Sequence, residues 1–324
     1  MRQRAGIALA AGLLLAAFAR AGVDEFRWQL PVGFPEPAVP ADNPMSAAKV
    51  ALGAMLFADP RLSITGNHSC QSCHSPARAF TDGLPRSLGA TGETLPLNAP
   101  TLLNVAYNAS LGWRDPAVRT LEQQMRGPLF NAHPIELGLG GREHELIAEL
   151  SADAGMARRF DAAFPGAELP VTMDNAIRAI AAYERTLLAG NSPFDRYVFA
   201  GEHRALSDRQ KAGMQLFFGD AGCARCHGGI NFNGEWADRE HPEARPSFAD
   251  TGTGVAVRVP TLRNLAATAP YMHDGRFAAL DAVLENYDHL AADPAADPRL
   301  RRAPLTTDER GELRAFLLSL SGGR

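Results

Sequence analysis

The sequence predicts an all-α protein made of two tandem domains. Three observations support this prediction. A Cys-x-x-Cys-His pentapeptide occurs at 70–74 and again at 223–227, and segments around the two copies also repeat. Apolar residues recur at helical spacing, without a long alternating run typical of strands. A chain of 324 residues is long enough for two ordinary domains. We expect an N-terminal domain over 22–195 and a C-terminal domain over 196–324.

Residues 1–21 have the pattern of a secretory signal peptide. Arg2 and Arg4 precede an apolar run from Ala5 to Phe18, and small residues follow it. The run is short and rich in Ala and Gly for a spanning helix, so an uncleaved anchor is the less favoured alternative. Removing the segment removes three arginines and no acid, which lowers the formal net charge from −4 to −7. We therefore expect a periplasmic protein that is not membrane-embedded and does not bind nucleic acid.

The remaining elements are an extended arm and several helices. Five prolines between 31 and 44 predict an extended arm. Similar segments at 51–57 and 211–217 predict a helix before each pentapeptide. Apolar spacing predicts another helix over 173–188, with Gly190 as its stop signal. The patterns Ser-x-x-Gln at 207–210 and Thr-x-x-Glu at 306–309 predict capping boxes at the start of two further helices.

The two pentapeptides contain every cysteine of the chain, and their pattern is the attachment motif of c-type haem. Two thiols form thioethers to the porphyrin, and the adjacent histidine ligates the iron. Zinc is an alternative, but the pairs lie about 150 residues apart and zinc does not require the histidines. Local disulfides or a thioredoxin-like redox pair also leave the histidines unexplained. We therefore predict two covalently attached haem c groups, bound through Cys70, Cys73, His74, Cys223, Cys226 and His227.

The duplication extends beyond the pentapeptides. The pattern Pro-Thr-Leu-x-Asn-x-Ala at 100–106 recurs at 260–266, 160 residues later. Nine residues after the asparagine of this pattern stands Trp113 in the first copy and His273 in the second. The two halves therefore carry different chemistry at one position of the repeat, and we expect that position to serve function.

These motifs, together with segments 28–31, 42–49, 133–139 and 269–275, resemble the bacterial di-haem cytochrome c peroxidase family. The resemblance covers nearly all of the mature sequence and is strongest to the MbnH-type enzymes of the MauG branch. It implies a di-haem c-type oxidoreductase that uses hydrogen peroxide.

The resemblance implies that the second haem is ligated by His227 and Tyr287. Family peroxidases have a methionine fourteen residues after the histidine that matches His273, whereas MauG-like enzymes have a tyrosine there, as this chain does. A thioether raises the potential of haem iron, and an anionic phenolate favours ferric and higher-valent iron. The alternatives are that Tyr287 is a buried aromatic on a helix face, or that Met272 is the ligand.

The first haem is expected to meet peroxide. Between residues 75 and 97 there is no His, Met, Lys, Tyr or Cys, so we predict a five-coordinate iron held by His74. The resemblance implies that Glu136, Gln124 and Pro128 form the distal pocket, with Glu136 moving a proton between the peroxide oxygens. The alternative for Glu136 is a solvated loop acid.

Two further roles follow from the resemblance. Trp113 takes the position between the haems, where an indole can relay an electron, although a core tryptophan is the ordinary alternative. One Ca²⁺ is expected between the domains, held by neutral oxygens of Asn98, Thr268 and Pro270.

The leading hypothesis is an oxidase that uses hydrogen peroxide and a high-valent state shared by two haems. It would oxidise a tryptophan of a small exported partner of the MbnP type to kynurenine, in connection with copper handling. The second hypothesis is a di-haem peroxidase that takes electrons from a small c-type cytochrome and reduces peroxide to water. The third is an electron carrier with two six-coordinate haems.

Overall fold

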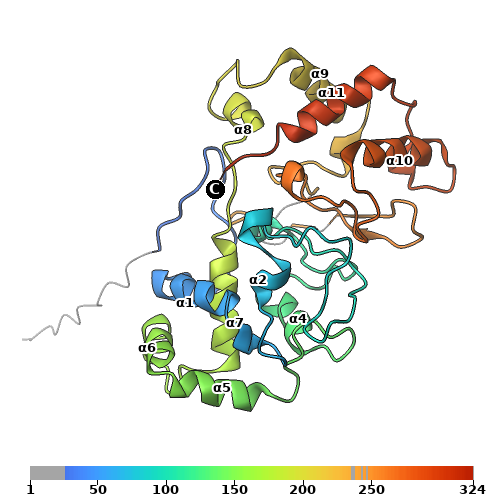
Figure 1. Cartoon of the computed structure of the whole chain (residues 1–324). Helices are drawn as coiled ribbons and strands as arrows, with labels where there is room; N and C mark the ends of the chain where they lie inside the picture. The colour runs from blue at the N-terminus through green and yellow to red at the C-terminus, as the bar shows by residue number, and fades with distance from the viewer. Residues whose placement is uncertain (1–25, 235–237, 242–243, 246, 324) are drawn as a thin grey trace, which may run out of the picture.

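A computed structural model describes residues 26–234, 238–241, 244–245 and 247–323 (Figure 1). The predicted signal peptide at 1–21 lies outside these residues. Helices are the main regular secondary structure within them, although loops make up more of the chain, and residues 26–46 form the expected arm without helix or strand. In the described part, no helix is both long and apolar enough to cross a membrane.

The described residues form α-helices and short 3₁₀ helices. The α-helices are α1 (Ala47–Phe57), α2 (Cys70–Cys73), α3 (Leu121–Gln124), α4 (Arg126–Phe130), α5 (Glu143–Ala152), α6 (Ala154–Ala163), α7 (Met173–Arg185), α8 (Pro193–Val198), α9 (Asp208–Phe218), α10 (Leu280–Ala292) and α11 (Thr307–Leu318). The 3₁₀ helices are η1 (Pro60–Leu62), η2 (Pro76–Arg78), η3 (Val105–Tyr107), η4 (Cys223–Arg225), η5 (Leu265–Ala267) and η6 (Pro298–Leu300).

Helix starts agree with the sequence signals, and one helix end differs. Ser207 and Thr306 form the capping boxes that open α9 and α11, as predicted. Helix α7 ends at Arg185 rather than at 188. The backbone leaves the helix there because Asn104 binds the next segment: its backbone N donates to the Leu187 carbonyl at 2.7 Å, and its side-chain amide pairs with Ala189.

The two halves use the same helix crossing. Helix α1 packs on α7, and α9 packs on α11. A Cβ added to Gly53 would lie 1.9 Å from the carbonyl oxygen of Ala179, and one added to Gly213 would lie 2.0 Å from that of Glu312. The repeated glycine therefore lets the backbones of the paired helices touch, which a larger residue prevents.

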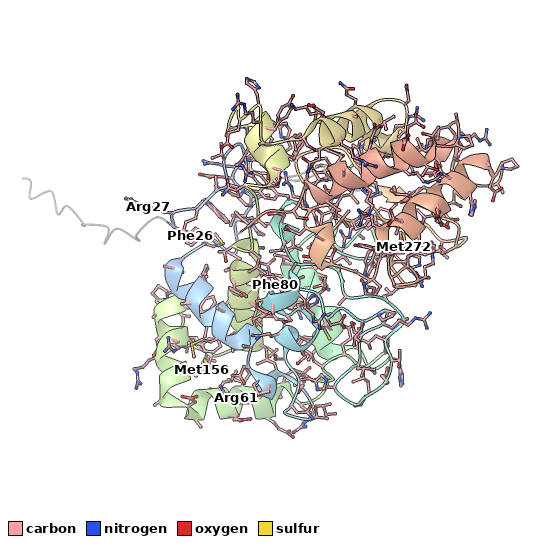
Figure 2. All side chains as sticks on the ribbon, turned by 45° about the horizontal axis from the view of Figure 1, so that its top comes forward. Phe26, Arg27, Arg61, Phe80, Met156 and Met272 are labelled. Atoms are coloured by element: carbon pink, nitrogen blue, oxygen red, sulfur yellow. The ribbon has the colours of Figure 1, made fainter. Side chains whose placement is uncertain are left out.

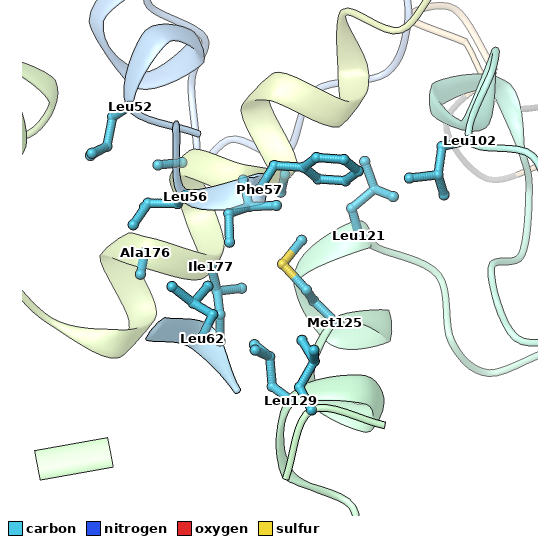
Figure 3. Close-up of a cluster of buried hydrophobic side chains, with 14 of the residues drawn as sticks. Leu52, Leu56, Phe57, Leu62, Leu102, Leu121, Met125, Leu129, Ala176 and Ile177 are labelled. Carbon is cyan, nitrogen blue, oxygen red and sulfur yellow. The ribbon is translucent and has the colours of Figure 1, made fainter. Parts of the chain in front are cut away.

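Two large apolar clusters lie in different parts of the chain. The first joins residues between Leu52 and Ala189 and is mainly aliphatic, as Figure 3 shows around Met125. The second joins residues between Phe194 and Leu320 and is richer in phenylalanine. Figure 2 shows Phe80 among the helices of the first part and Met272 in the second. The domain limits at 195 and 196 remain a prediction.

Polar contacts and the chain end join the two parts. Asn231 and Asn233 both donate to the side-chain oxygen of Asn108, at 3.2 and 2.8 Å. The C-terminal end returns to the segment between α7 and α8, where Gly190 N donates to Gly323 O at 3.2 Å (Figure 1). Both sets of contacts hold the C-terminal part against the N-terminal part.

One antiparallel ladder departs from the all-α prediction. Strand β1 (Phe248–Ala249) pairs with β2 (Val257–Arg258), and the connecting turn contains Gly252 and Gly254 with positive φ. Two residues per strand are too few to produce an alternating sequence pattern, so sequence inspection does not detect them. The backbone N of Arg258 also donates to the Trp113 carbonyl at 2.8 Å, which joins the ladder to the N-terminal part.

Candidate haem sites and the residues between them

The first pentapeptide forms α2 and ends in a histidine that the backbone orients. His74 Nδ1 lies 3.0 Å from the carbonyl oxygen of Phe80. Phe80 and Ala79 have φ of 61° and 52°, and the hydroxyl of Thr101 donates to the Ala79 carbonyl at 2.5 Å. When Nδ1 donates to a carbonyl, Nε2 is left as the ligand atom. Burial lowers the pKa of His74, which favours the neutral ring that a metal requires.

The second pentapeptide is built in the same way. His227 Nδ1 lies 3.1 Å from the carbonyl oxygen of Phe232, whose φ is 52°. The hydroxyl of Thr261 donates to the Asn231 carbonyl at 2.6 Å, and burial lowers the pKa of His227 to about 4. The threonine of each Pro-Thr-Leu repeat thus holds the loop that orients the histidine. The sequence revealed the repeat, but this function required the structure.

The first cavity has about 1700 Å³ of empty space and brings together distant segments. Cys70, Cys73 and His74 line it, and so do Trp113 and the three predicted pocket residues, Gln124, Pro128 and Glu136. Gln124 ends α3, Pro128 lies in α4, and Glu136 follows in the next loop. Glu136 is half-buried, and this burial raises its pKa.

The first cavity also contains side chains that sequence inspection missed. His68 and Met125 line it, although neither lies in the 75–97 loop on which the five-coordinate prediction rests. Met125 packs in the apolar cluster of Figure 3, and His68 Nδ1 lies 2.8 Å from the Asn67 amide oxygen. Glu184 of α7 also lines the cavity, and burial raises its pKa to about 8. Five-coordination therefore stays a prediction.

The second cavity has about 1320 Å³ of empty space and is lined by Cys223, Cys226 and His227. Tyr287 lines it from α10, and so does Met272. Leu280, Val283 and Leu284 of the same helix also line it, so the apolar helix face and the candidate ligand point to one space. Burial raises the pKa of Tyr287. Tyr287 and Met272, the two alternative iron ligands considered from the sequence, therefore both line this cavity.

Trp113 and Arg258 line both cavities. The indole Nε1 donates to the Asn98 carbonyl at 3.2 Å. The ring centroid of Trp113 lies 6.4 Å from that of His273 and 5.2 Å from the guanidinium carbon of Arg258. Trp113 is therefore half-buried beside polar groups from both parts of the chain. Sequence inspection singled out Trp113 but not Arg258, because a single arginine carries no specific signal in the sequence.

The residues of both cavities suit haem. All four cysteines are free thiols, and each pair shares a mainly apolar cavity with its histidine. Buried Arg258 Nε and His273 Nδ1 have no hydrogen-bond partner among the described residues, as expected for groups that meet the carboxylates of a porphyrin. Within the described ranges, no group of three or more His, Cys, Asp or Glu is arranged to hold a metal ion.

The calcium site stays a prediction, and its expected ligands make other contacts in the structure. The Asn98 amide donates to the Leu84 carbonyl at 2.7 Å, and its backbone N donates to the His273 carbonyl at 2.8 Å. Thr268 and Pro270 are half-buried in the segment that leads to His273.

Two cavities that each contain a Cys-x-x-Cys-His motif define a c-type haem protein with two sites. The family model for di-haem cytochrome c peroxidase matches residues 47–204. The chain is 35% identical over 307 residues to methylamine utilization protein MauG of Methylorubrum extorquens, covering 91% of this chain and 83% of that protein. It is 36% identical over 295 residues to cytochrome c551 peroxidase of Pseudomonas aeruginosa, covering 86% and 80%.

A solved structure also supports this family. The chain is similar, with a TM-score of 0.85 and 37% identity, to a crystal structure described as a MauG-like protein associated with microbial copper homeostasis. The match covers 92% of this chain and 96% of that one. The chain belongs to the di-haem cytochrome c peroxidase family that includes MauG. It is an oxidoreductase that uses peroxide and two c-type haems, and the predicted family is confirmed.

Proposed function

We propose that this protein is a periplasmic oxidase that uses hydrogen peroxide to oxidise a tryptophan of a partner protein to kynurenine. Each half of the chain would form one domain and bind one haem c, through Cys70, Cys73 and His74 in the first half and through Cys223, Cys226 and His227 in the second. The observation that carries the proposal is that Trp113 lines both cavities while Tyr287 lines the second. The similarity to a MauG-like protein associated with copper homeostasis supports the same proposed function.

In the proposed reaction, the side chains of the two cavities have different roles. The haems, when bound, supply the electrons that reduce peroxide. Glu136 takes a proton from one peroxide oxygen and returns it to the leaving one, and the pKa that its half-buried position raises suits it to carry that proton. Gln124 and Pro128 shape the same space. Trp113 relays electrons between the cavities. Tyr287 would hold the iron of the second haem through its phenolate oxygen.

The overall reaction balances with two peroxide molecules. Tryptophan loses four electrons and four protons and gains two water molecules, which yields N-formylkynurenine. Two hydrogen peroxide molecules accept those electrons and protons and leave as four waters. Hydrolysis then releases formate and leaves kynurenine. The substrate tryptophan need not enter either cavity, because aromatic side chains can carry the electrons.

The test is mass spectrometry of a small exported partner with an exposed tryptophan, after treatment with the haem-loaded enzyme and peroxide. The proposal expects one tryptophan with two added oxygens, or its kynurenine product. Tyr287→Met should abolish this product while leaving haem attachment intact. An unmodified partner, or an equally active Tyr287→Met variant, would contradict the proposal.

The second candidate is a di-haem cytochrome c peroxidase. The similarity to cytochrome c551 peroxidase of Pseudomonas aeruginosa favours it. Met272 also lines the second cavity, and a thioether ligand there suits an electron-storing haem. Rapid peroxide consumption with reduced cytochrome c as electron donor, together with Met272 as the iron ligand, would select this function.

A further inference from the structure

Arg258 is a buried arginine for which the described residues supply no counter-charge. Its side chain is 6% exposed, its Nε has no partner, and it forms no ion pair with a described residue. Burial alone lowers its pKa to about 10, so the side chain remains a cation at neutral pH. An unpaired buried charge is costly, and such groups normally bind an anion.

Two other buried arginines have the carboxylate partner that Arg258 lacks among the described residues. Arg263 forms a two-pronged ion pair with Asp195, with both N–O distances at 2.9 Å. Arg185 pairs with Glu122 at 2.8 Å. Arg258 has no such acid, although its backbone is held by β2 and by the Trp113 carbonyl. The fold therefore fixes the backbone of Arg258, but the negative charge that would pair with its side chain does not come from the described residues.

The surroundings of Arg258 indicate which anion completes the site. Arg258 lines both cavities, and His273, whose Nδ1 also lacks a partner, lines the second cavity with it. Haem has two carboxylates, and a planar guanidinium binds carboxylates with two parallel hydrogen bonds. A haem carboxylate supplies the missing charge without any further ligand.

The same guanidinium also covers an indole. Its carbon lies 5.2 Å from the ring centroid of Trp113, within the range of a cation–π contact. A cation at this distance opposes the loss of an electron from the ring, because the two positive charges repel. The Asn98 carbonyl, which accepts the indole N–H at 3.2 Å, acts in the opposite direction.

We propose that Arg258 is a positioning residue shared by both haem sites, which binds haem carboxylate and keeps Trp113 in place and in its reduced form between the cavities. Trp113 then passes electrons without accumulating as a cation radical. The role assigned to Arg258 depends on the relay function proposed for Trp113, whereas its contact with haem carboxylate does not.

The test compares three haem-loaded variants. Arg258→Gln removes the charge, Arg258→Lys keeps the charge without the two-pronged group, and Arg204→Gln removes a charge from an exposed position as the control. The first measurement is the reduction potential of each haem by spectroscopic titration. Because a nearby cation favours reduced iron, Arg258→Gln should lower at least one potential, Arg258→Lys should lower it less, and Arg204→Gln should match the wild type.

The second measurement is electron paramagnetic resonance after peroxide addition. Arg258→Gln should accumulate a tryptophan radical that the wild type lacks, and adding Trp113→Phe should remove that signal. Unchanged potentials in both Arg258 variants would overturn the carboxylate contact. An equal radical signal in the wild type would overturn the protection of Trp113. If Arg258→Gln fails to load haem, Arg258→Lys decides the proposal by the same two measurements.

If Trp113→Phe leaves oxidation of the partner unchanged while the potentials still respond to Arg258, the proposed relay fails and the carboxylate contact stands. This outcome separates failure of the proposed function from failure of the assignment to Arg258.

Discussion

The ring of Trp113 lies 6.4 Å from the ring of His273, and these two residues occupy the same position of the internal repeat. Each stands nine residues after the asparagine of its Pro-Thr-Leu-x-Asn pattern. Asn104 and Asn264 have φ of 59° and 60°, so the backbone turns in the same way in both halves. The duplication has thus produced a contact between two equivalent positions with different chemistry, at the point where the two cavities approach.

Trp113→Phe should reduce oxidation of the partner protein to background. Phenylalanine preserves an aromatic ring next to His273 but is much harder to oxidise than indole. Haem content and the first reaction with peroxide should stay unchanged, because Glu136 and His74 are untouched. Rapid-mixing spectroscopy separates the two steps. A variant that modifies the partner at the wild-type rate would exclude the relay.

Glu136 should control the pH dependence of the reaction with peroxide. Burial raises its pKa above the ordinary value of 4.5, and only the ionised carboxylate can accept the first proton. The rate should therefore rise with pH and inflect above that value. Glu136→Gln should lower the rate by about 10²- to 10⁴-fold and remove the inflection. Stopped-flow rates over a pH series provide the measurement, and exposed Glu149→Gln is the control.

Glu184 should weaken the fold as pH rises. Its pKa in the folded chain is about 8, above the ordinary 4.5, because of burial. Between these values the folded chain holds a proton that the unfolded chain has released, so the free energy of unfolding falls as pH increases. Glu184→Gln should reduce this dependence and be stabilised relative to the wild type towards pH 8. Urea unfolding at several pH values checks the sign, and identical slopes for both proteins would refute it.

Gly213→Ala should destabilise the C-terminal part. Its Cβ would lie 2.0 Å from the Glu312 carbonyl, so α9 and α11 must separate. Overpacking of this kind costs about 1–3 kcal/mol of unfolding free energy. Gly323→Ala is the matched control, because no atom lies within 4 Å of its added Cβ. Denaturant unfolding of both variants should show a loss in Gly213→Ala alone.

Much of the fold and site could be predicted because the signals are local or repeated. Capping boxes at Ser207 and Thr306 depend on residues three positions apart, and both are confirmed. The end of α7 was predicted three residues too late, because Asn104, far away in sequence, binds the segment that follows it. The short ladder of β1 and β2 was missed because two-residue strands have no period.

Covalent chemistry and residue order are properties of the chain itself, so the sequence alone established the two haem attachment motifs, the duplication and the family. The fold was needed to find the carbonyls of Phe80 and Phe232 that orient the ligand histidines. It was also needed to bring Glu184 and Met125 into the first cavity and to lay Arg258 over Trp113. These relationships depend on burial and on distances between remote segments, which arise only when the chain packs.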